Sequence, residues 1–210
     1  MPKFGKSIVI EGNDGTGKST QVEMYAQYLM QQHGIESLII HEPDGPVEEC
    51  ARLRAKIKDA TIARTPEENL EWFTQSREIS NAYANEFYLP NGKWVLRARN
   101  YLSTLAYQGA GEGLSEDLIL RVTEQRLGQK YMHPDHTIIL DLSDPEERAK
   151  RIAKRGKLEV PDTFESKGDD FQRKVKAAYV RLAMQYGYPI INANQRPEQI
   201  QAEIREIIGV

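Results

Sequence analysis

Short apolar runs recur along the chain, and each is followed by turn residues and then by a helical pattern of apolar and polar positions. Their near-continuous Ile, Val and Leu content is typical of strands that are covered on both faces, and such strands are parallel. We expect five strands, at residues 7–12, 37–45, 93–98, 136–142 and 188–193. The segments between them predict helices at 18–33, about 46–60, 66–89, about 101–108, 115–131, 145–155, 168–186 and 197–208.

This alternation of strands and helices predicts an α/β fold of three layers, a five-stranded parallel sheet with helices on both faces. We expect a single domain over residues 1–210, because the chain shows no internal repeat, low-complexity tract or linker. Ligands of such sheets bind beyond the carboxyl ends of the strands. The chemistry of this chain is therefore expected at those ends.

The composition narrows the class of protein. Hydrophobic residues make up 40% of the chain and charged residues 28%, which excludes a disordered or fibrous protein. The net charge of −3 provides no sequence-wide positive field, so we expect neither a nucleic-acid nor a membrane partner. A single cysteine, Cys50, fits a reducing compartment, and no run reaches the roughly 18 apolar residues of a membrane helix. These features predict a cytoplasmic protein.

The segment GNDGTGKST, residues 12–20, matches the phosphate-binding pattern G-x-x-x-x-G-K-[ST] between the first strand and the first helix. Its glycines allow backbone N–H groups to surround phosphate oxygens. Lys18 can reach the β- and γ-phosphates, and the Ser19 hydroxyl can bind Mg²⁺. The fold is therefore expected to be of the P-loop NTPase type. We expect the nucleoside triphosphate to bind at Gly12, Asn13, Asp14, Gly15, Thr16, Gly17, Lys18, Ser19 and Thr20.

A second group of residues suggests a site for a nucleobase. Phe73 and Arg77 lie four positions apart on the predicted helix 66–89 and so share one face. A ring beside a guanidinium can stack on a base and hydrogen-bond its carbonyl. The N-K-x-D and D-x-x-G motifs of a GTPase do not occur at suitable positions, which disfavours that class.

Five segments in order resemble the thymidylate kinase family of nucleoside monophosphate kinases: IEGNDGTGKST, HEPDG, ARNYLSTLAYQG, RIAKRG and DTFE. The segment YPIINANQRPEQIQAEI is similar to that family's last strand and helix, so the resemblance covers nearly the whole chain. It implies transfer of the γ-phosphate of ATP to dTMP with Mg²⁺, giving dTDP, and a homodimer packed through helices. The alternatives are a kinase for another monophosphate such as dUMP, and a catalytically impaired relative that only binds nucleotides.

The resemblance implies that segments 66–89 and 97–113 form the acceptor site. Phe73 would stack on thymine and Arg77 would hydrogen-bond its O4. Ser103 and Gln108 would face the edge of the base.

The sugar and phosphate of the acceptor are assigned in the same way. Asp14 would hold the 3′-hydroxyl, and Tyr107 would close against C2′ and favour deoxyribose. Arg99 would bind the acceptor phosphate, helped by Arg54 or by its rival Arg52.

A short basic lid is expected at about residues 150–167. Such a lid would stabilise the charge on the migrating phosphoryl group and exclude water. Some relatives carry an arginine in the P-loop, but Gly15 stands there, so the lid must supply the charge. Arg151 and Arg155 match the family pattern R-x-x-x-R-G and join Lys18 and Arg99 as the expected catalytic residues. Thr163 stands where many relatives have arginine.

One carboxylate of the family is missing. The strand before the serine usually ends in Asp-Arg-Tyr or Asp-Arg-His, whereas this chain has Ala98, Arg99 and Asn100. The aspartate would normally help to organise Mg²⁺ and its waters. Either the protein is catalytically impaired, or Glu42 and Asp44 at the end of a neighbouring strand hold the metal through water. Glu42 is also expected in the substrate site.

Overall fold

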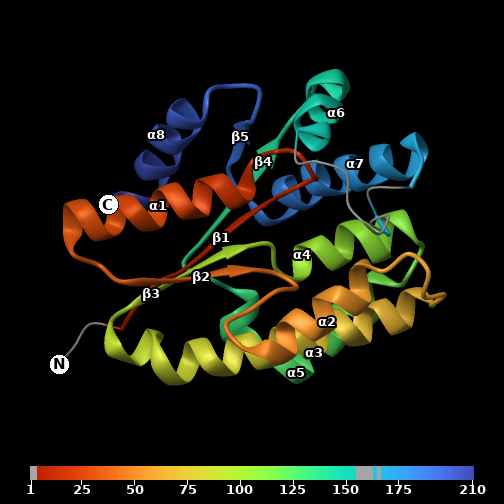
Figure 1. Ribbon diagram of the computed structural model, residues 1–210, viewed down its shortest axis with the longest axis horizontal. Coiled ribbons are helices and arrows are strands. Elements are labelled where there is room, and N and C mark those ends of the chain that lie inside the picture. Colours follow the sequence, from red (N-terminus) through yellow and green to blue (C-terminus); the bar gives the residue numbers. More distant parts are fainter. Residues whose placement is uncertain (1–3, 155–162, 165–166) are drawn as a thin grey trace.

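The apolar runs form the strands of one sheet, which lies between two layers of helices (Figure 1). The computed structural model describes residues 4–154, 163–164 and 167–210. The strands are β1 (Ser7–Gly12), β2 (Ser37–His41), β3 (Trp94–Ala98), β4 (His136–Asp141) and β5 (Ile190–Asn192). Their order is β2-β3-β1-β4-β5, and every neighbouring pair is parallel. The predicted five-stranded parallel sheet is confirmed.

Strand β2 is shorter than the run 37–45 predicted. It ends at His41, and the N–H of Asp44 donates to the carbonyl of His41 (2.8 Å) in a turn. Pro43 lies inside this turn and has no N–H with which a strand could continue. Glu42 and Asp44 therefore lie in a loop at the carboxyl edge of the sheet.

The helices lie close to the predicted ranges and differ mainly at their ends. They are α1 (Lys18–His33), α2 (Glu48–Lys58), α3 (Pro66–Phe87), α4 (Tyr101–Thr104), α5 (Glu116–Met132), α6 (Pro145–Ala153), α7 (Asp169–Tyr186) and α8 (Pro197–Ile208). A 3₁₀ turn, η1 (Leu89–Asn91), follows α3, and a π-helical segment, η2 (Leu105–Gly111), follows α4. In Figure 1, α1 and α8 cover one face of the sheet, and α2, α3 and α5 cover the other.

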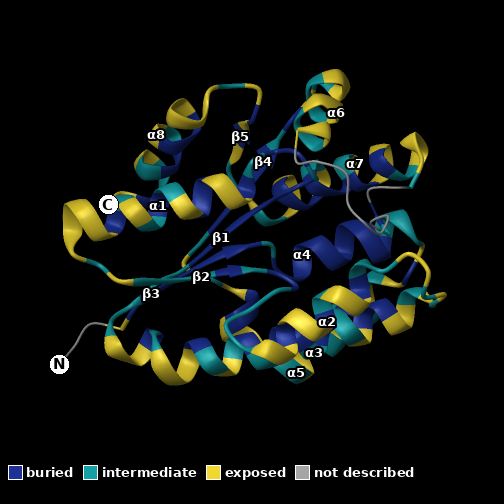
Figure 2. Ribbon diagram, viewed as in Figure 1, coloured by how far each residue is buried: buried dark blue, intermediate teal, exposed yellow. Residues whose placement is uncertain are grey.

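The helix after β3 is enclosed on all sides. All four residues of α4 are buried, and Figure 2 shows it in the colour of buried residues along its length. The predicted helix 101–108 thus becomes α4 and then the π-helix η2. π-Helical turns are frequent at functional sites. This one carries Tyr107 and Gln108.

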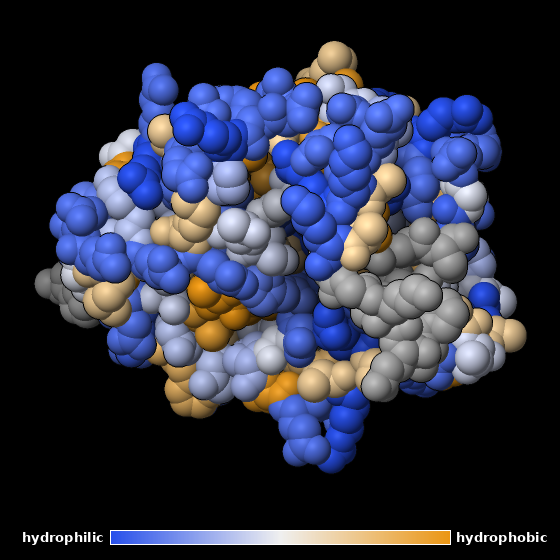
Figure 3. Space-filling view, turned by 45° about the horizontal axis from the view of Figure 1, so that its top comes forward, coloured by the Kyte–Doolittle hydropathy of each residue, from blue (hydrophilic) through white to orange (hydrophobic). Residues whose placement is uncertain are grey.

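The surface of the molecule is mostly hydrophilic. Hydrophilic residues cover most of the face in Figure 3, and hydrophobic residues show as small patches between them. Within the described ranges, no helix is long and apolar enough to cross a membrane.

Candidate active site

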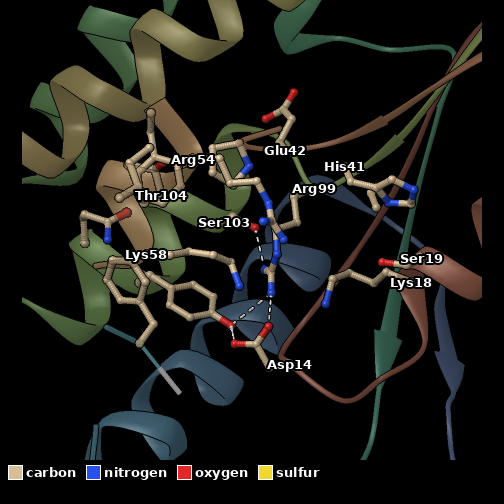
Figure 4. Close-up of a pocket in the computed structure, with 17 residues that line it drawn as sticks. Asp14, Lys18, Ser19, His41, Glu42, Arg54, Lys58, Arg99, Ser103 and Thr104 are labelled. Carbon is tan, nitrogen blue, oxygen red and sulfur yellow. Dashed lines mark hydrogen bonds and ion pairs between the residues drawn. The ribbon is translucent and has the colours of Figure 1, made fainter. Parts of the chain in front are cut away.

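A cavity of about 160 Å³ opens at the carboxyl edge of the sheet, between the P-loop, α2, α3 and the α4–η2 segment (Figure 4). Most side chains predicted for the site line this cavity: Asp14, Lys18, Ser19, Glu42, Arg54, Phe73, Arg99, Ser103, Tyr107 and Gln108. Segments far apart in the sequence therefore meet where the topology of the sheet led us to expect a ligand.

The P-loop is packed closely against strand β4 and is held by hydrogen bonds to its own backbone. Gly12 has a φ of +139°, and a Cβ there would lie 2.3 Å from the carbonyl oxygen of Leu140. The Lys18 ammonium and the Thr16 hydroxyl both donate to the carbonyl of Asn13, at 2.8 and 2.9 Å. Lys18 is thereby held at the mouth of the loop, where the sequence pattern places the phosphates.

Asp14 leaves the P-loop and meets the acceptor side of the cavity. Its carboxylate accepts hydrogen bonds from the Arg99 guanidinium and from the Tyr107 hydroxyl, the latter at 2.7 Å (Figure 4). Burial alone raises the pKa of this carboxyl. The charges of Arg99 and Lys18 outweigh burial, so the pKa of Asp14 lies well below its usual range. The carboxylate is therefore ionised and oriented before any ligand arrives.

Arg99 has an unusual backbone conformation, with a φ of +84°. A non-glycine residue in this region is strained, and such strain is found at functional sites. The buried carboxylate of Glu11 holds the next turn by accepting from the backbone N–H groups of Asn100 (2.7 Å) and Ser103 (3.1 Å). Glu11 also accepts from the Ser103 hydroxyl and the Tyr179 hydroxyl, each at 2.9 Å. Sequence reasoning missed Glu11, although a carboxylate near the end of an apolar strand was a usable signal.

The base side of the cavity is aromatic. Phe164 lies 6.1 Å from Phe73 and 5.6 Å from Tyr107, measured between ring centroids. Phe73 and Tyr107 were predicted to contact the acceptor, and Phe164 of the DTFE segment adds a third ring. A flat ligand would therefore find apolar faces on this side.

Arg77 does not line the cavity. Its guanidinium lies 5.3 Å from the Phe73 ring, as the helical spacing predicts, but donates to Glu42 (2.7 Å), Thr104 (2.7 Å) and the carbonyl of Asn100 (2.8 Å). The side chain is fully buried. In this structure Arg77 fixes the floor of the cavity, and its contact with a base stays a prediction.

Glu42 reaches the cavity, yet its carboxylate already has partners. Besides Arg77, the hydroxyl of Tyr131 donates to it at 3.0 Å, and Arg97 lies 3.7 Å away. Asp44, the other carboxylate predicted to hold Mg²⁺, does not line the cavity. Asp44 accepts from the N–H of Gly45 (2.9 Å) and lies 3.7 Å from Arg54.

Helix α2 presents two cations to the cavity. Arg54 and Lys58 are four residues apart on one face, and both line it. Arg52, the rival of Arg54, instead pairs with Glu48 (2.8 Å) and Glu49 (3.4 Å) on the exposed side of the helix. Sequence reasoning missed Lys58, because the sequence does not show which of the charged side chains of this helix face the cavity.

Arg148, two residues before the expected lid, contacts the P-loop, whereas Arg151 does not. Arg148 Nε donates to the carbonyl of Asp14 (2.9 Å), and its Cγ lies 3.1 Å from the position of a Cβ on Gly15. Arg151 donates to Glu147 (2.8 Å) and to the carbonyl of Ala193 (3.0 Å). Arg155 and most of the expected lid at 150–167 lie outside the described residues.

Two further side chains that were predicted to contact the base form hydrogen bonds within the protein. The Ser103 hydroxyl is engaged by Glu11, Tyr179 and Arg99 rather than turned freely toward a base. The Gln108 amide donates to Glu112 at 3.3 Å. Both side chains line the cavity, and their contact with a base stays a prediction.

The residues present fit a metal that is shared with phosphate. Among the described residues, no group of three His, Cys, Asp or Glu side chains could hold a metal alone. Ser19 does line the cavity beside Lys18. Mg²⁺ typically keeps several waters and binds through one or two protein oxygens plus substrate phosphates. The Ser19 hydroxyl supplies such an oxygen.

The fold and the site define an α/β protein of the P-loop NTPase type, in which the phosphate-binding loop faces a second, cationic and aromatic half-site. A solved thymidylate kinase from Ehrlichia chaffeensis has this fold, with a TM-score of 0.76 at 22% identity, covering 98% of this chain and 99% of that one. The sequence model of the family described as Thymidylate kinase matches residues 10–204. The chain belongs to the thymidylate kinase family.

Relatives support the assignment over the whole length. The thymidylate kinase of Shewanella sp. (strain MR-4) is 34% identical over 205 residues, which is 97% of this chain and 95% of that protein. The thymidylate kinase of Carboxydothermus hydrogenoformans is 31% identical over 201 residues, covering 96% and 95% of the two chains. The resemblance that five short segments implied is thereby confirmed.

Proposed function

We propose that the protein transfers the γ-phosphoryl group of ATP to dTMP, giving dTDP and ADP. The observation that carries this proposal is the joining of Asp14 in the P-loop to Arg99 and Tyr107 in a single cavity with Lys18. A phosphate donor at the P-loop and an acceptor on Arg99 would then lie side by side. Family membership supports the same reaction.

The acceptor nucleoside would lie between Asp14 and the aromatic side of the cavity. The hydroxyl of Tyr107 is fixed by Asp14 (2.7 Å) and Asn13 (2.9 Å), so the ring keeps one orientation. A fixed ring against C2′ would exclude a 2′-hydroxyl by contact. Phe73 would stack on the base. Arg77 would either support the base site from below or exchange one of its present hydrogen bonds for one to the base.

The phosphates would meet cations from three elements. Lys18 and Arg99 are the proposed catalytic contacts, and Arg54 would help to bind the acceptor phosphate. The acceptor already carries a nucleophilic oxygen, so no strong general base is needed. Positioning and charge stabilisation supply most of the acceleration in phosphoryl transfer.

We infer that Arg148 contributes charge beside Gly15. Its bond to the carbonyl of Asp14 places a guanidinium against the P-loop, whereas Arg151 faces Ala193. Arg151 and Arg155 stay the candidates from the family pattern. Comparing kcat of Arg148→Ala with that of Arg151→Ala separates the two: loss of a phosphoryl contact costs about 10²-fold or more, and a larger loss at Arg151 would contradict the inference.

Mg²⁺ is proposed as the metal, with Ser19 as its protein ligand. When bound, it would neutralise charge on the phosphate oxygens. A homodimer, a single domain over 1–210 and a cytoplasmic location remain further predictions. Light scattering of the purified protein would test the dimer directly.

The proposed reaction is tested by ADP release with ATP and Mg²⁺ and a panel of acceptors: dTMP, dUMP, dCMP, dGMP and UMP. We expect dTMP to give the highest kcat/KM. One methyl group is worth only about 1–3 kcal/mol, so dUMP should follow within about 10–200-fold. Another preferred acceptor would overturn the specificity argument, and no turnover with intact nucleotide binding would identify an impaired relative.

The ring of Tyr107 is tested against its hydroxyl with two variants. Tyr107→Phe keeps the ring and should keep the preference for dUMP over UMP. Tyr107→Ala removes the ring and should lose that preference. Equal preference in all three proteins would contradict the role of the ring.

A further inference from the structure

Ala98, which stands where the family usually has an aspartate, has a polar neighbour on the next strand. In the parallel pair of β2 and β3, the Cα partner of Ala98 is His41. Side chains at paired positions point to the same face of a sheet. Ala98 and His41 both line the cavity together with Ser19. In Figure 4, His41 and Ser19 lie on the same side of the cavity, next to Lys18.

His41 is linked to the helix that carries Ser19. Its Nε2 lies 3.4 Å from a carboxylate oxygen of Glu23. Glu23 follows Ser19 by four residues on α1, so both side chains share one face of that helix. The expected metal ligand and the imidazole therefore line one cavity, and the Glu23 carboxylate contacts the imidazole from helix α1.

The second ring nitrogen of His41 is an unexplained buried polar atom. Nδ1 is buried and has no hydrogen-bond partner among the residues that the structure describes. Buried polar atoms are normally paired, and an exception often marks a place for a water or an ion. A carboxylate beside Nε2 favours the proton on that nitrogen and leaves the Nδ1 lone pair as an acceptor.

The carboxylates of the β2 loop offer less to a metal. Glu42 lines the cavity, but its carboxylate accepts hydrogen bonds from Arg77 and Tyr131. Asp44 does not line the cavity and faces Arg54. Only Glu42 shares the cavity with Ser19, and its oxygens are already in use.

Resting on the proposed function, we propose that His41, oriented by Glu23, replaces the missing carboxylate and accepts hydrogen bonds from the water shell of the divalent metal at Ser19. His41 is a positioning residue in this role, since it acts through water. The ligand class is a hydrated divalent cation bound together with nucleoside triphosphate. Loss of such an outer contact typically costs 10–100-fold in metal affinity.

The test uses Mn²⁺ as the probe and reads its binding, without acceptor and without turnover. Free Mn²⁺ is followed by its EPR signal while the full-length protein is titrated at saturating ATP. We expect His41→Ala to bind Mn²⁺ about 10-fold more weakly than wild type, with Glu23→Gln weakened in the same direction. His33→Ala is the matched control, because His33 lies at the far end of α1 and does not line the cavity.

A rescue distinguishes this role from a purely structural one. Ala98→Asp returns the carboxylate, so in that background His41→Ala should change Mn²⁺ affinity by less than about 2-fold. ATP binding in EDTA and the melting temperature should be the same in all variants. A full 10-fold loss in the Ala98→Asp background would overturn the proposal.

Two other outcomes also overturn it. One is Mn²⁺ binding by His41→Ala that equals the His33→Ala control. The other is a loss confined to Asp44→Ala, which would assign the water shell to Asp44. Because the titration needs no acceptor, absence of dTMP turnover would reject the proposed function without deciding this question.

Discussion

Two buried glutamates lie at the carboxyl edge of the sheet, but they bind different kinds of partner. Glu11 near the end of β1 and Glu42 just after β2 are both buried beside the cavity. The donors to Glu11 are uncharged, namely backbone N–H groups and the hydroxyls of Ser103 and Tyr179. Glu42 instead receives the guanidinium of Arg77 and lies near that of Arg97.

The difference shows that a buried glutamate can stabilise either a backbone turn or a pair of buried cations. Glu11 fixes a backbone turn, and through it the strained conformation of Arg99. Glu42 fixes two side-chain cations beneath the cavity, where an unpaired guanidinium would be costly. One carboxylate thus sets the path of the chain, and the other balances charge.

The largest effect is expected for Glu11→Ala. Three backbone N–H groups, those of Gly12, Asn100 and Ser103, and two hydroxyls would lose their acceptor inside the core, so the free energy of unfolding should fall by about 4 kcal/mol. Arg99 would lose its support, and kcat/KM for dTMP should fall with it. Urea unfolding and steady-state kinetics measure the two effects. A fall of less than about 1 kcal/mol would mean that Glu11 does not hold the turn.

A smaller effect with a partial rescue is expected for Glu42→Gln. Neutralising the carboxylate leaves Arg77 buried without its counter-charge, at a cost of about 3 kcal/mol. Adding Arg77→Met removes the unpaired cation, so the double variant should cost about 2 kcal/mol less than the sum of the single ones. Additive losses would show that the two side chains do not act as a pair.

A third carboxylate, Asp14, sharpens the comparison because it faces the cavity. Its folded-state pKa is depressed, so its ionised form stabilises the fold above the unfolded value of 3.8, and this contribution is lost as the pH falls further. Asp14→Asn should be less stable than wild type by about 1.5 kcal/mol at pH 7. The difference should stay constant down to about pH 5 and shrink below the unfolded pKa. A difference that shrinks already between pH 7 and 5 would contradict the depressed pKa.

The smallest effects come from a matched pair of tyrosines. Tyr179→Phe removes one donor to Glu11, and Tyr131→Phe removes one donor to Glu42. Each should cost about 1 kcal/mol of stability. Only Tyr179 also touches Arg99 (3.2 Å), so only Tyr179→Phe should raise the KM for dTMP. Equal kinetic effects would mean that both carboxylates position the acceptor site.

Periodicity predicted the sheet and most helix ranges because both depend on burial of apolar side chains. It could not predict the end of β2 at His41, which a proline turn decides, or the π-helix that follows α4. Motif spacing placed Asp14, Lys18 and Arg99 at one site, since the ends of parallel strands meet. The partners of Arg77, Ser103 and Arg151 depend on residues distant in sequence, and no spacing rule contains them.

The backbone of Arg99 has a consequence for protein engineering. Glycine adopts a φ of +84° without strain, so Arg99→Gly would relax the turn while deleting the guanidinium. Relief of the backbone strain therefore favours glycine at this position, whereas the ion pair with Asp14 and the proposed catalysis favour arginine. A library sorted for growth that depends on the enzyme should retain arginine there, and one sorted for thermal resistance alone would show whether the backbone strain or the ion pair with Asp14 has the larger effect on stability.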